Sequence, residues 1–362
     1  MKTRNVKVLL SVGIILFIAW ALVACNKNKD EIVIKTDLTT AVAAASALIT
    51  TTHEGVAGGN YLRGSQALFT ATITQAQSIL DNANATQADV TAAVASLAAA
   101  TLTYNSKLVV AIDAANLVGQ WTFDEITTSA ADAVVKDYAG THHGALKAGD
   151  PYWAGTGVPS LAADRYGDVG RALHFDKGQN VEIPYAAALN PGTISISLWE
   201  KQDVETSIFP YQYMVAMNRK YGYKLQLQYA PMAFFTTRVL SGADTISYDK
   251  DQHEGSVPQG TWTHIVVTFG GGHEVFYING ALLFDWGADG TLLPGTILSL
   301  AAKPVNLTFG QDLPTSKYST NPLSRSYVND GGFFHGTMDE IRIYKSVLTA
   351  EQVTSIYNLE KP

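Results

Sequence analysis

The sequence predicts a mainly β protein, an antiparallel jelly-roll β-sandwich preceded by a small three-helix bundle. The composition changes near residue 110, from a stretch rich in Ala, Thr, Leu and Gln to one that holds all prolines and five of the six tryptophans. Apolar residues recur at helical spacing in the first stretch and at every second position in the second. Many short alternating runs with no helical pattern between them are typical of a sandwich or jelly roll.

Residues 1–24 are predicted to be a lipoprotein signal peptide. Basic residues at positions 2, 4 and 7 precede an apolar run from Val8 to Val23, which is the order of a secretory signal. The run is short for a membrane span, which needs about 20 apolar residues. It ends in Leu-Val-Ala-Cys, which resembles the lipobox of bacterial lipoproteins. The resemblance implies lipidation of Cys25 after cleavage before it; a transmembrane anchor is the alternative.

Residues 25–35 are predicted to be a tether. Cys25 is the single cysteine of the chain, so no disulfide can form within it. The charged stretch Asn26 to Glu31 resembles export signals of lipoproteins in glycan-degrading Gram-negative bacteria. That resemblance implies an outer membrane lipoprotein that faces the cell surface and touches the membrane through its lipid alone. A solvated tether without a sorting role is the alternative.

The net charge of −7 argues against nucleic acid as a partner. Proteins that bind nucleic acid neutralise phosphates with clustered Lys and Arg, and the mature chain has no such cluster.

Residues 36–110 are predicted to be the three-helix bundle. The first helix has one apolar face, and the Gly-containing segment 54–60 ends it; that face comprises Leu38, Val42, Ala45 and Ile49. Ser65 is expected to cap the second helix, and Thr86 with Asp89 resembles a capping box for the third.

The bundle resembles sugar-associated three-helix modules of bacterial surface proteins in two segments, residues 61–65 and 81–90. Neither segment contains a catalytic constellation. We therefore expect the bundle to act as a spacer or docking element, with direct ligand binding as the alternative.

Residues 115–362 are predicted to be the sandwich. Its alternating runs are Trp121 and Phe123; Leu173 and Phe175; Ile194, Ile196 and Leu198; Ile265, Val267 and Phe269; and Ile341 and Ile343. An Asn-Gly pair at residues 279–280 predicts a hairpin turn. A capping box from Thr349 to Gln352 predicts a closing helix.

Four ordered segments of this region resemble the laminin-G/pentraxin-like branch of the concanavalin A-like lectin and glucanase superfamily. They are residues 117–125 with 135–144, 170–176 with 181–199, 262–269 with 275–280, and 307–310 with 334–353. The resemblance implies the sandwich fold but no single function, since this fold carries lectins, adhesion modules and enzymes.

The protein is expected not to be an enzyme. The glucanase branch carries a Glu-x-Asp-x-x-Glu strand motif, which this sequence lacks. Two adjacent pairs, Asp124-Glu125 and Asp339-Glu340, would point to opposite faces of a strand and could not act on one sugar bond. A glycoside hydrolase whose carboxylates come from separate strands remains the alternative.

A structural calcium ion is implied by the resemblance, with Asp137 and Asp339 as its ligands. Calcium takes six to eight oxygens, so main-chain carbonyls near residues 140–143 would have to contribute. The alternative is that Asp137 caps its own turn and Asp339 pairs with a basic residue.

A sugar site needs exposed aromatic rings with polar partners. Trp153 and Trp286 lie among Gly, Pro and Asp and are the preferred platforms, whereas Trp121, Trp199 and Trp262 alternate with strand residues and are assigned to the core. The other candidate ligand-binding residues are Tyr152, Tyr166, Arg165, Arg325 and Tyr327.

These features together favour a non-catalytic carbohydrate-binding lipoprotein that captures a poly- or oligosaccharide for a degradation and uptake system. The alternative is an adhesion or scaffold module that binds a protein of the outer membrane. Exposed aromatic rings beside polar groups would favour the first, and a flat apolar patch the second.

Overall fold

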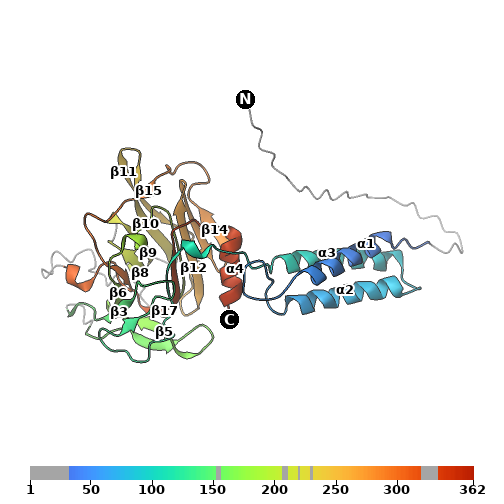
Figure 1. Ribbon diagram of the computed structural model, residues 1–362, viewed down its shortest axis with the longest axis horizontal. Coiled ribbons are helices and arrows are strands. Elements are labelled where there is room, and N and C mark those ends of the chain that lie inside the picture. The colour runs from blue at the N-terminus through green and yellow to red at the C-terminus, as the bar shows by residue number, and fades with distance from the viewer. Residues whose placement is uncertain (1–31, 152–155, 206–210, 219–220, 229–230, 319–332) are drawn as a thin grey trace.

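The computed structural model describes residues 32–151, 156–205, 211–218, 221–228, 231–318 and 333–362. The predicted signal peptide and Cys25 lie outside these residues. Figure 1 shows a rod of helices that projects from a larger β body, with the last helix of the chain between them.

The rod contains α1 (Thr36–Thr51), α2 (Ser65–Asp81) and α3 (Gln87–Asn105). Its core includes three stacked rings, because Tyr104 lies 4.2 Å from Tyr61 and 4.7 Å from Phe69 between ring centroids. The capping box of α3 is confirmed, since the Thr86 hydroxyl accepts the Asp89 N–H and the Asp89 carboxylate accepts the Thr86 N–H.

The predicted cap at Ser65 is wrong. The helix begins at Ser65 itself, after Gly64 in the left-handed region (φ 83°). The Ser65 hydroxyl donates instead to the carbonyl of Leu62 at 2.6 Å.

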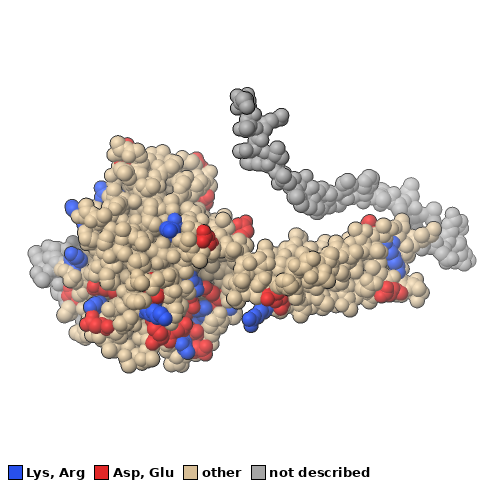
Figure 2. Space-filling view, viewed as in Figure 1, with Lys and Arg blue, Asp and Glu red and all other residues tan. Residues whose placement is uncertain are grey.

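The sides of the rod carry almost no charge. The three helices contain a single charged residue each, Asp37, Asp81 and Asp89, and Figure 2 shows charged atoms near the ends of the rod with an uncharged stretch between them. No helix in the described ranges is long and apolar enough to cross a membrane.

The β body consists of two antiparallel sheets. The eight-stranded sheet has the order β14-β13-β12-β7-β17-β5-β4, and β1 pairs with β17. Its strands are β1 (Leu117–Trp121), β4 (Ser160–Ala163), β5 (Val169–Phe175), β7 (Ile194–Gln202), β12 (Thr263–Gly270), β13 (His273–Ile278), β14 (Ala281–Asp285) and β17 (Gly336–Tyr344).

The nine-stranded sheet has the order β11-β10-β9-β8-β16-β6-β3-β2, and β15 pairs with β10. Its strands are β2 (Val134–Val135), β3 (Gly144–Lys147), β6 (Asn180–Ile183), β8 (Tyr211–Met217), β9 (Tyr223–Gln228), β10 (Met232–Ser241), β11 (Asp244–Asp251), β15 (Thr296–Ile297) and β16 (Leu307–Phe309).

One continuous hydrophobic core fills the space between the sheets. Alternate residues of β7, Ile194, Ile196 and Leu198, face into it, as period-two patterning requires. Trp121 packs edge-on against Phe309 of the opposite sheet, with ring centroids 5.1 Å apart. The predicted sandwich preceded by a helical bundle is confirmed.

The hairpin between β13 and β14 forms at the predicted Asn-Gly pair. Asn279 (φ 50°) and Gly280 (φ 77°) both occupy the left-handed region, which a tight two-residue hairpin turn requires.

The other tryptophans assigned to the core lie in different environments. Trp199 is buried on the outer side of its sheet, against Tyr357 of the closing helix, with ring centroids 5.8 Å apart. Trp262 precedes β12 and is only half-buried, so the core assignment is wrong for it.

The closing helix α4 (Ala350–Glu360) begins at the predicted capping box and joins the rod to the sandwich. The Ser355 hydroxyl accepts the Val110 N–H at 2.9 Å and donates to the Leu108 carbonyl at 3.2 Å. The Gln352 amide donates to the Ala111 carbonyl at 2.9 Å. These bonds fix the last residues of the rod against a helix that packs on the eight-stranded sheet.

Candidate functional site

A cavity of about 640 Å³ opens at the turn between β8 and β9. The turn lies opposite the segment 298–305, which connects β15 to β16. The cavity is lined by Asn218, Tyr221, Arg238, Leu298, Ser299, Leu300, Ala302, Lys303 and Val305.

The turn places an aromatic ring at this cavity. Asn218 adopts a left-handed conformation (φ 62°), which Asn tolerates better than most residues, and its carbonyl accepts the Tyr221 N–H at 2.9 Å. Gly222 follows because a Cβ there would lie 2.3 Å from the Met217 carbonyl oxygen. The side chain of Tyr221 is left 49 % exposed.

Arg238 of β10 supplies a guanidinium beside this ring. Its backbone N–H donates to the Gly222 carbonyl at 3.1 Å, and its carbonyl accepts the Leu298 N–H at 2.7 Å. The guanidinium carbon lies 5.3 Å from the centroid of the Tyr221 ring, within the range of a cation–π contact. The Nε atom is buried without a hydrogen-bond partner among the described residues.

The remaining lining is mixed. Lys303, the Asn218 amide and the Ser299 hydroxyl add polar groups, and leucine and valine side chains supply an apolar wall. A ring with donors at its side and an apolar wall can hold a small ring compound that has apolar C–H faces and polar edges.

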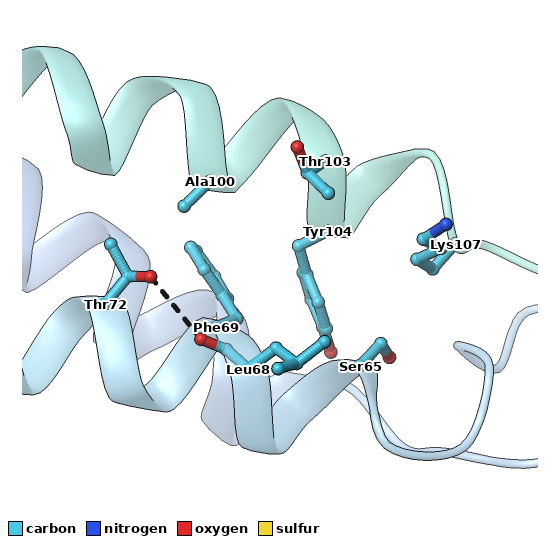
Figure 3. A pocket seen from close by; sticks show the side chains of 8 residues that line it. All are labelled: Ser65, Leu68, Phe69, Thr72, Ala100, Thr103, Tyr104 and Lys107. Atoms are coloured by element: carbon cyan, nitrogen blue, oxygen red, sulfur yellow. Dashed lines mark hydrogen bonds between the residues drawn. The ribbon is translucent and has the colours of Figure 1, made fainter.

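A smaller cavity of about 250 Å³ lies between α2 and α3 in the rod (Figure 3). The rings of Phe69 and Tyr104 point toward it, but both residues are only 2 % exposed. The Tyr104 hydroxyl is hydrogen-bonded to the Thr52 hydroxyl at 2.7 Å. Since neither ring presents an open face, this groove offers no aromatic platform and we assign it no ligand.

Trp286 does not line the sandwich cavity. It packs against the core and against Phe284, 4.8 Å away between ring centroids. Its indole N–H donates to the Asp251 carbonyl, and the Lys250 ammonium lies 4.4 Å from the ring centroid. The ring is thus half-buried and occupied by intramolecular contacts. Four other predicted binding residues lie outside the described residues: Tyr152, Trp153, Arg325 and Tyr327.

Arg165 and Tyr166 both bond to the end of α4, and Tyr166 remains 51 % exposed. Arg165 donates from Nη1 to Asp339 at 2.6 Å and from Nε to the Glu360 carbonyl at 2.6 Å. The Tyr166 hydroxyl donates to the same carbonyl at 2.6 Å. The Arg165 side chain is only 6 % exposed, so it is not available to an external ligand.

The expectation that Asp339 and Glu340 point to opposite faces is wrong. A β-bulge interrupts β17 here, and Glu340 takes a left-handed conformation (φ 52°). Both carboxylates therefore approach the Arg165 guanidinium, at 2.6 Å and 3.9 Å. Burial, with the neighbouring Glu340, raises the pKa of Asp339 to about 8.

The two aspartates proposed for calcium are occupied by N–H donors. Asp137 Oδ1 accepts the N–H groups of Gln120 and Ala139 at 2.9 and 2.8 Å, and its Oδ2 accepts that of His142 at 3.0 Å. Asp339 faces Arg165. As placed, these oxygens serve a turn and an ion pair, and the described residues contain no group of three His, Cys, Asp or Glu placed to hold a metal. Calcium binding here stays a prediction.

Two carboxylates that follow different strands lie near one histidine: Asp176 comes after β5 and Glu205 after β7. His335 Nδ1 lies 3.0 Å from Asp176 Oδ1 and 3.7 Å from Glu205 Oε1. Both carboxylates thus lie near the same imidazole nitrogen. A histidine bonded to neighbouring carboxylates is common in proteins without catalytic activity, so this cluster does not strengthen the hydrolase alternative.

The sequence reasoning missed Tyr221, Arg238 and Lys303. The signal available for Tyr221 was its place in a short, basic turn between two strands. No local pattern pointed to Arg238 or Lys303, because they reach the cavity from β10 and from a distant connection.

Part of the β body matches a known protein family. Residues 175–354 match the family described as the concanavalin A-like lectin/glucanases superfamily. No curated protein sequence gives a significant match.

Several solved structures are similar at low sequence identity. Domain 4 of an extracellular arabinanase from Geobacillus stearothermophilus, in complex with arabinotriose, has 20 % identity and a TM-score of 0.43; 67 % of this chain and 98 % of that chain are covered. The binding domain of Paraclostridial Mosquitocidal Protein 1 has 15 % identity and a TM-score of 0.45, with 68 % and 52 % covered. The ligand-binding domain of botulinum neurotoxin serotype D, in complex with N-acetylneuraminic acid, has 12 % identity and a TM-score of 0.43, with 68 % and 52 % covered. The chain thus spans about half the length of the last two of these structures.

Proposed function

Starting from a domain of the concanavalin A-like lectin/glucanases superfamily at residues 175–354, we propose that this protein is a non-catalytic carbohydrate-binding protein. Its ligand, a poly- or oligosaccharide, lies in the cavity at the β8–β9 turn. The observation that carries this proposal is the half-exposed ring of Tyr221, set beside Arg238 in a cavity of about 640 Å³.

The physical basis is the two-sided chemistry of a sugar ring. Its C–H face is apolar and packs on an aromatic ring, while its hydroxyls need donors and acceptors around the rim. Tyr221 offers the ring, and the Asn218 amide, the Ser299 hydroxyl and the Arg238 guanidinium offer the polar partners. Small-molecule sites in proteins usually have a mostly apolar lining with a small number of polar groups that fix the orientation of the ligand.

We expect Tyr221→Ala to weaken glycan binding at least tenfold, which corresponds to about 1.4 kcal/mol. The matched control is Tyr138→Ala, because Tyr138 is 46 % exposed and also has a cation over its ring, Lys136 at 4.3 Å. It should bind like the parent protein.

The measurement uses the chain without residues 1–25 in a glycan array, followed by affinity electrophoresis and calorimetry on each hit. Every hit is assayed with calcium and with a chelator, and checked for cleaved product. Cleavage would establish the hydrolase alternative, and the absence of binding to any glycan would leave the protein-binding adhesion or scaffold module as the better function.

The proposal includes a place for the protein: an outer membrane lipoprotein on the cell surface, which captures glycans for a degradation and uptake system. The motif ending at Cys25 supports it, and the rod would serve as a spacer. We expect the parent protein to incorporate labelled palmitate and Cys25→Ser to lose the label. Externally added protease should degrade the parent protein on intact cells; protection from it would contradict the surface location.

A further inference from the structure

We propose that the cavity at the β8–β9 turn selects an anionic sugar, one that carries a carboxylate or a sulfate. This inference rests on the proposed function and names the ligand class of the same site. Of the nine lining residues, Arg238 and Lys303 carry positive charge and none carries negative charge.

The first argument is the unused donor of Arg238. Its Nε atom is buried and makes no hydrogen bond within the described ranges. A buried donor without a partner lowers the stability of the fold by about 1–3 kcal/mol. A ligand that supplies an acceptor to this nitrogen would remove that cost. Guanidinium forms paired hydrogen bonds with carboxylate or sulfate oxygens, which a neutral hydroxyl cannot reproduce.

The second argument is a contrast with the other arginines of the sandwich that the structure describes. Arg165 contacts Asp339 at 2.6 Å, Arg342 contacts Glu340 at 2.6 Å, and Arg171 lies 3.8 Å from Asp124. Each of these three has a carboxylate of the chain within ion-pair distance. Arg238 has none among the described residues, so its charge is left for a ligand.

The third argument is that the guanidinium is positioned before a ligand arrives. Both backbone polar groups of Arg238 are hydrogen-bonded, to Gly222 and to Leu298, and the Tyr221 ring lies beside its guanidinium. Preorganised groups lose less conformational entropy on binding, which favours affinity. Lys303 is exposed on the facing segment and adds a second charge that can adapt to the position of the anion.

The test compares acidic polymers with their neutral forms by affinity electrophoresis and calorimetry. One pair is polygalacturonate and its methyl ester, and the other is dextran sulfate and dextran. We expect the parent protein to bind at least one acidic member at least tenfold more tightly than its neutral form. Raising the salt concentration should weaken this binding, because the charges at the cavity mouth are screened. The two pairs distinguish a carboxylate from a sulfate ligand.

The variant that tests the site is Arg238→Gln, which should weaken the binding of acidic polymers at least tenfold. Arg238→Lys, which keeps the charge, should have an affinity between those of Arg238→Gln and the parent protein. Lys303→Gln should weaken it severalfold; because Lys303 is exposed, this variant keeps the test valid if Arg238→Gln does not fold. The matched control is Arg171→Gln, which removes an exposed arginine outside the cavity and should change nothing.

The outcomes separate the two proposals. Equal binding of acidic and neutral forms, still lost in Tyr221→Ala, would overturn the anionic ligand and leave the glycan-binding function. Acidic binding that survives in folded Arg238→Gln and in Lys303→Gln would overturn the assignment to this cavity. Failure to bind any glycan, acidic or neutral, would overturn both.

Discussion

Replacing Arg342 with methionine is expected to lower the free energy of unfolding by about 3–5 kcal/mol, the usual effect of removing one partner from a buried ion pair. Arg342 lies between two carboxylates, at 2.6 Å from Glu340 and 2.5 Å from Glu360. Without this guanidinium, both carboxylates stay buried near each other, and the nearest remaining positive charge is Arg165, 3.9 Å from Glu340. Burial and Glu360 already raise the pKa of Glu340, with Arg342 as the main opposing influence.

The same substitution should also weaken the contacts that hold α4 on the sandwich. Glu360 is the last residue of that helix, and its carboxylate also accepts the Trp199 indole N–H at 2.9 Å. If Glu360 leaves its buried position, the joint between rod and sandwich loosens. We therefore expect Arg342→Met to increase hydrogen exchange in α4 and at Val110, whose N–H is bonded to Ser355.

Urea unfolding at pH 7 measures the effect, and Arg171→Met is the control. Arg171 is half-exposed and 3.8 Å from a half-exposed aspartate, so its removal should change stability by less than about 1 kcal/mol. Adding Glu340→Gln and Glu360→Gln to Arg342→Met should restore part of the loss. Equal stability of Arg342→Met and the parent protein would show that the network does not hold α4.

Replacing Glu200 with glutamine is expected to stabilise the protein at alkaline pH and to leave it unchanged near pH 5. Glu200 lies in the interior of the sandwich, in register with Met338 of the core, and it is fully buried. Neither carboxyl oxygen has a well-formed hydrogen bond among the described residues. Burial raises the pKa of this carboxyl well above 4.5, with a smaller opposite effect from the backbone of Gln202.

The sign follows from proton binding. Above pH 4.5 the unfolded chain releases the Glu200 proton while the folded chain keeps it, so this residue destabilises the fold increasingly as pH rises. The loss amounts to about 1.4 kcal/mol for each pH unit until the folded-state pKa is passed. Glutamine has no carboxyl proton to lose. The difference in unfolding free energy between variant and parent therefore reports the titration of Glu200 alone, because other buried carboxyls such as Glu274 are present in both proteins.

Thermal or urea unfolding from pH 5 to pH 9 measures this difference. Glu254→Gln, at an exposed turn position, is the control and should track the parent protein at every pH. A constant difference between Glu200→Gln and the parent across this range would contradict a raised pKa for Glu200.

The sequence predicted what depends on local pattern. Alternation placed Ile194, Ile196 and Leu198 in one core face, because the side chains of a strand have a period of two whatever the strand pairs with. The capping box at Thr349 and the Asn-Gly turn at 279–280 were also predictable, since each depends on fewer than five neighbouring residues.

The sequence could not predict what depends on contacts between distant residues. Arg165 was predicted to bind a ligand, but it contacts Glu360, which lies 195 residues further along the chain. The bulge at Glu340 reverses the direction of a side chain without a glycine or proline to signal it. The cavity is likewise formed where the β8–β9 turn, β10 and the segment before β16 meet, which no linear motif records.

The uncharged rod also sets the electrical surroundings of the cavity. The chain enters the rod at the end far from α4, where Ile34 bonds to the start of α3 and Lys35 to the end of α2. The 19 residues of α3 extend about 28 Å at 1.5 Å per residue. Under the proposed anchoring at Cys25, a rod upright on the bilayer would separate the sandwich from it by roughly three Debye lengths, since one such length is about 8–10 Å in physiological salt. At that separation, salt would screen most of the electrostatic repulsion between anionic lipid headgroups and the acidic polymer that we propose Arg238 binds.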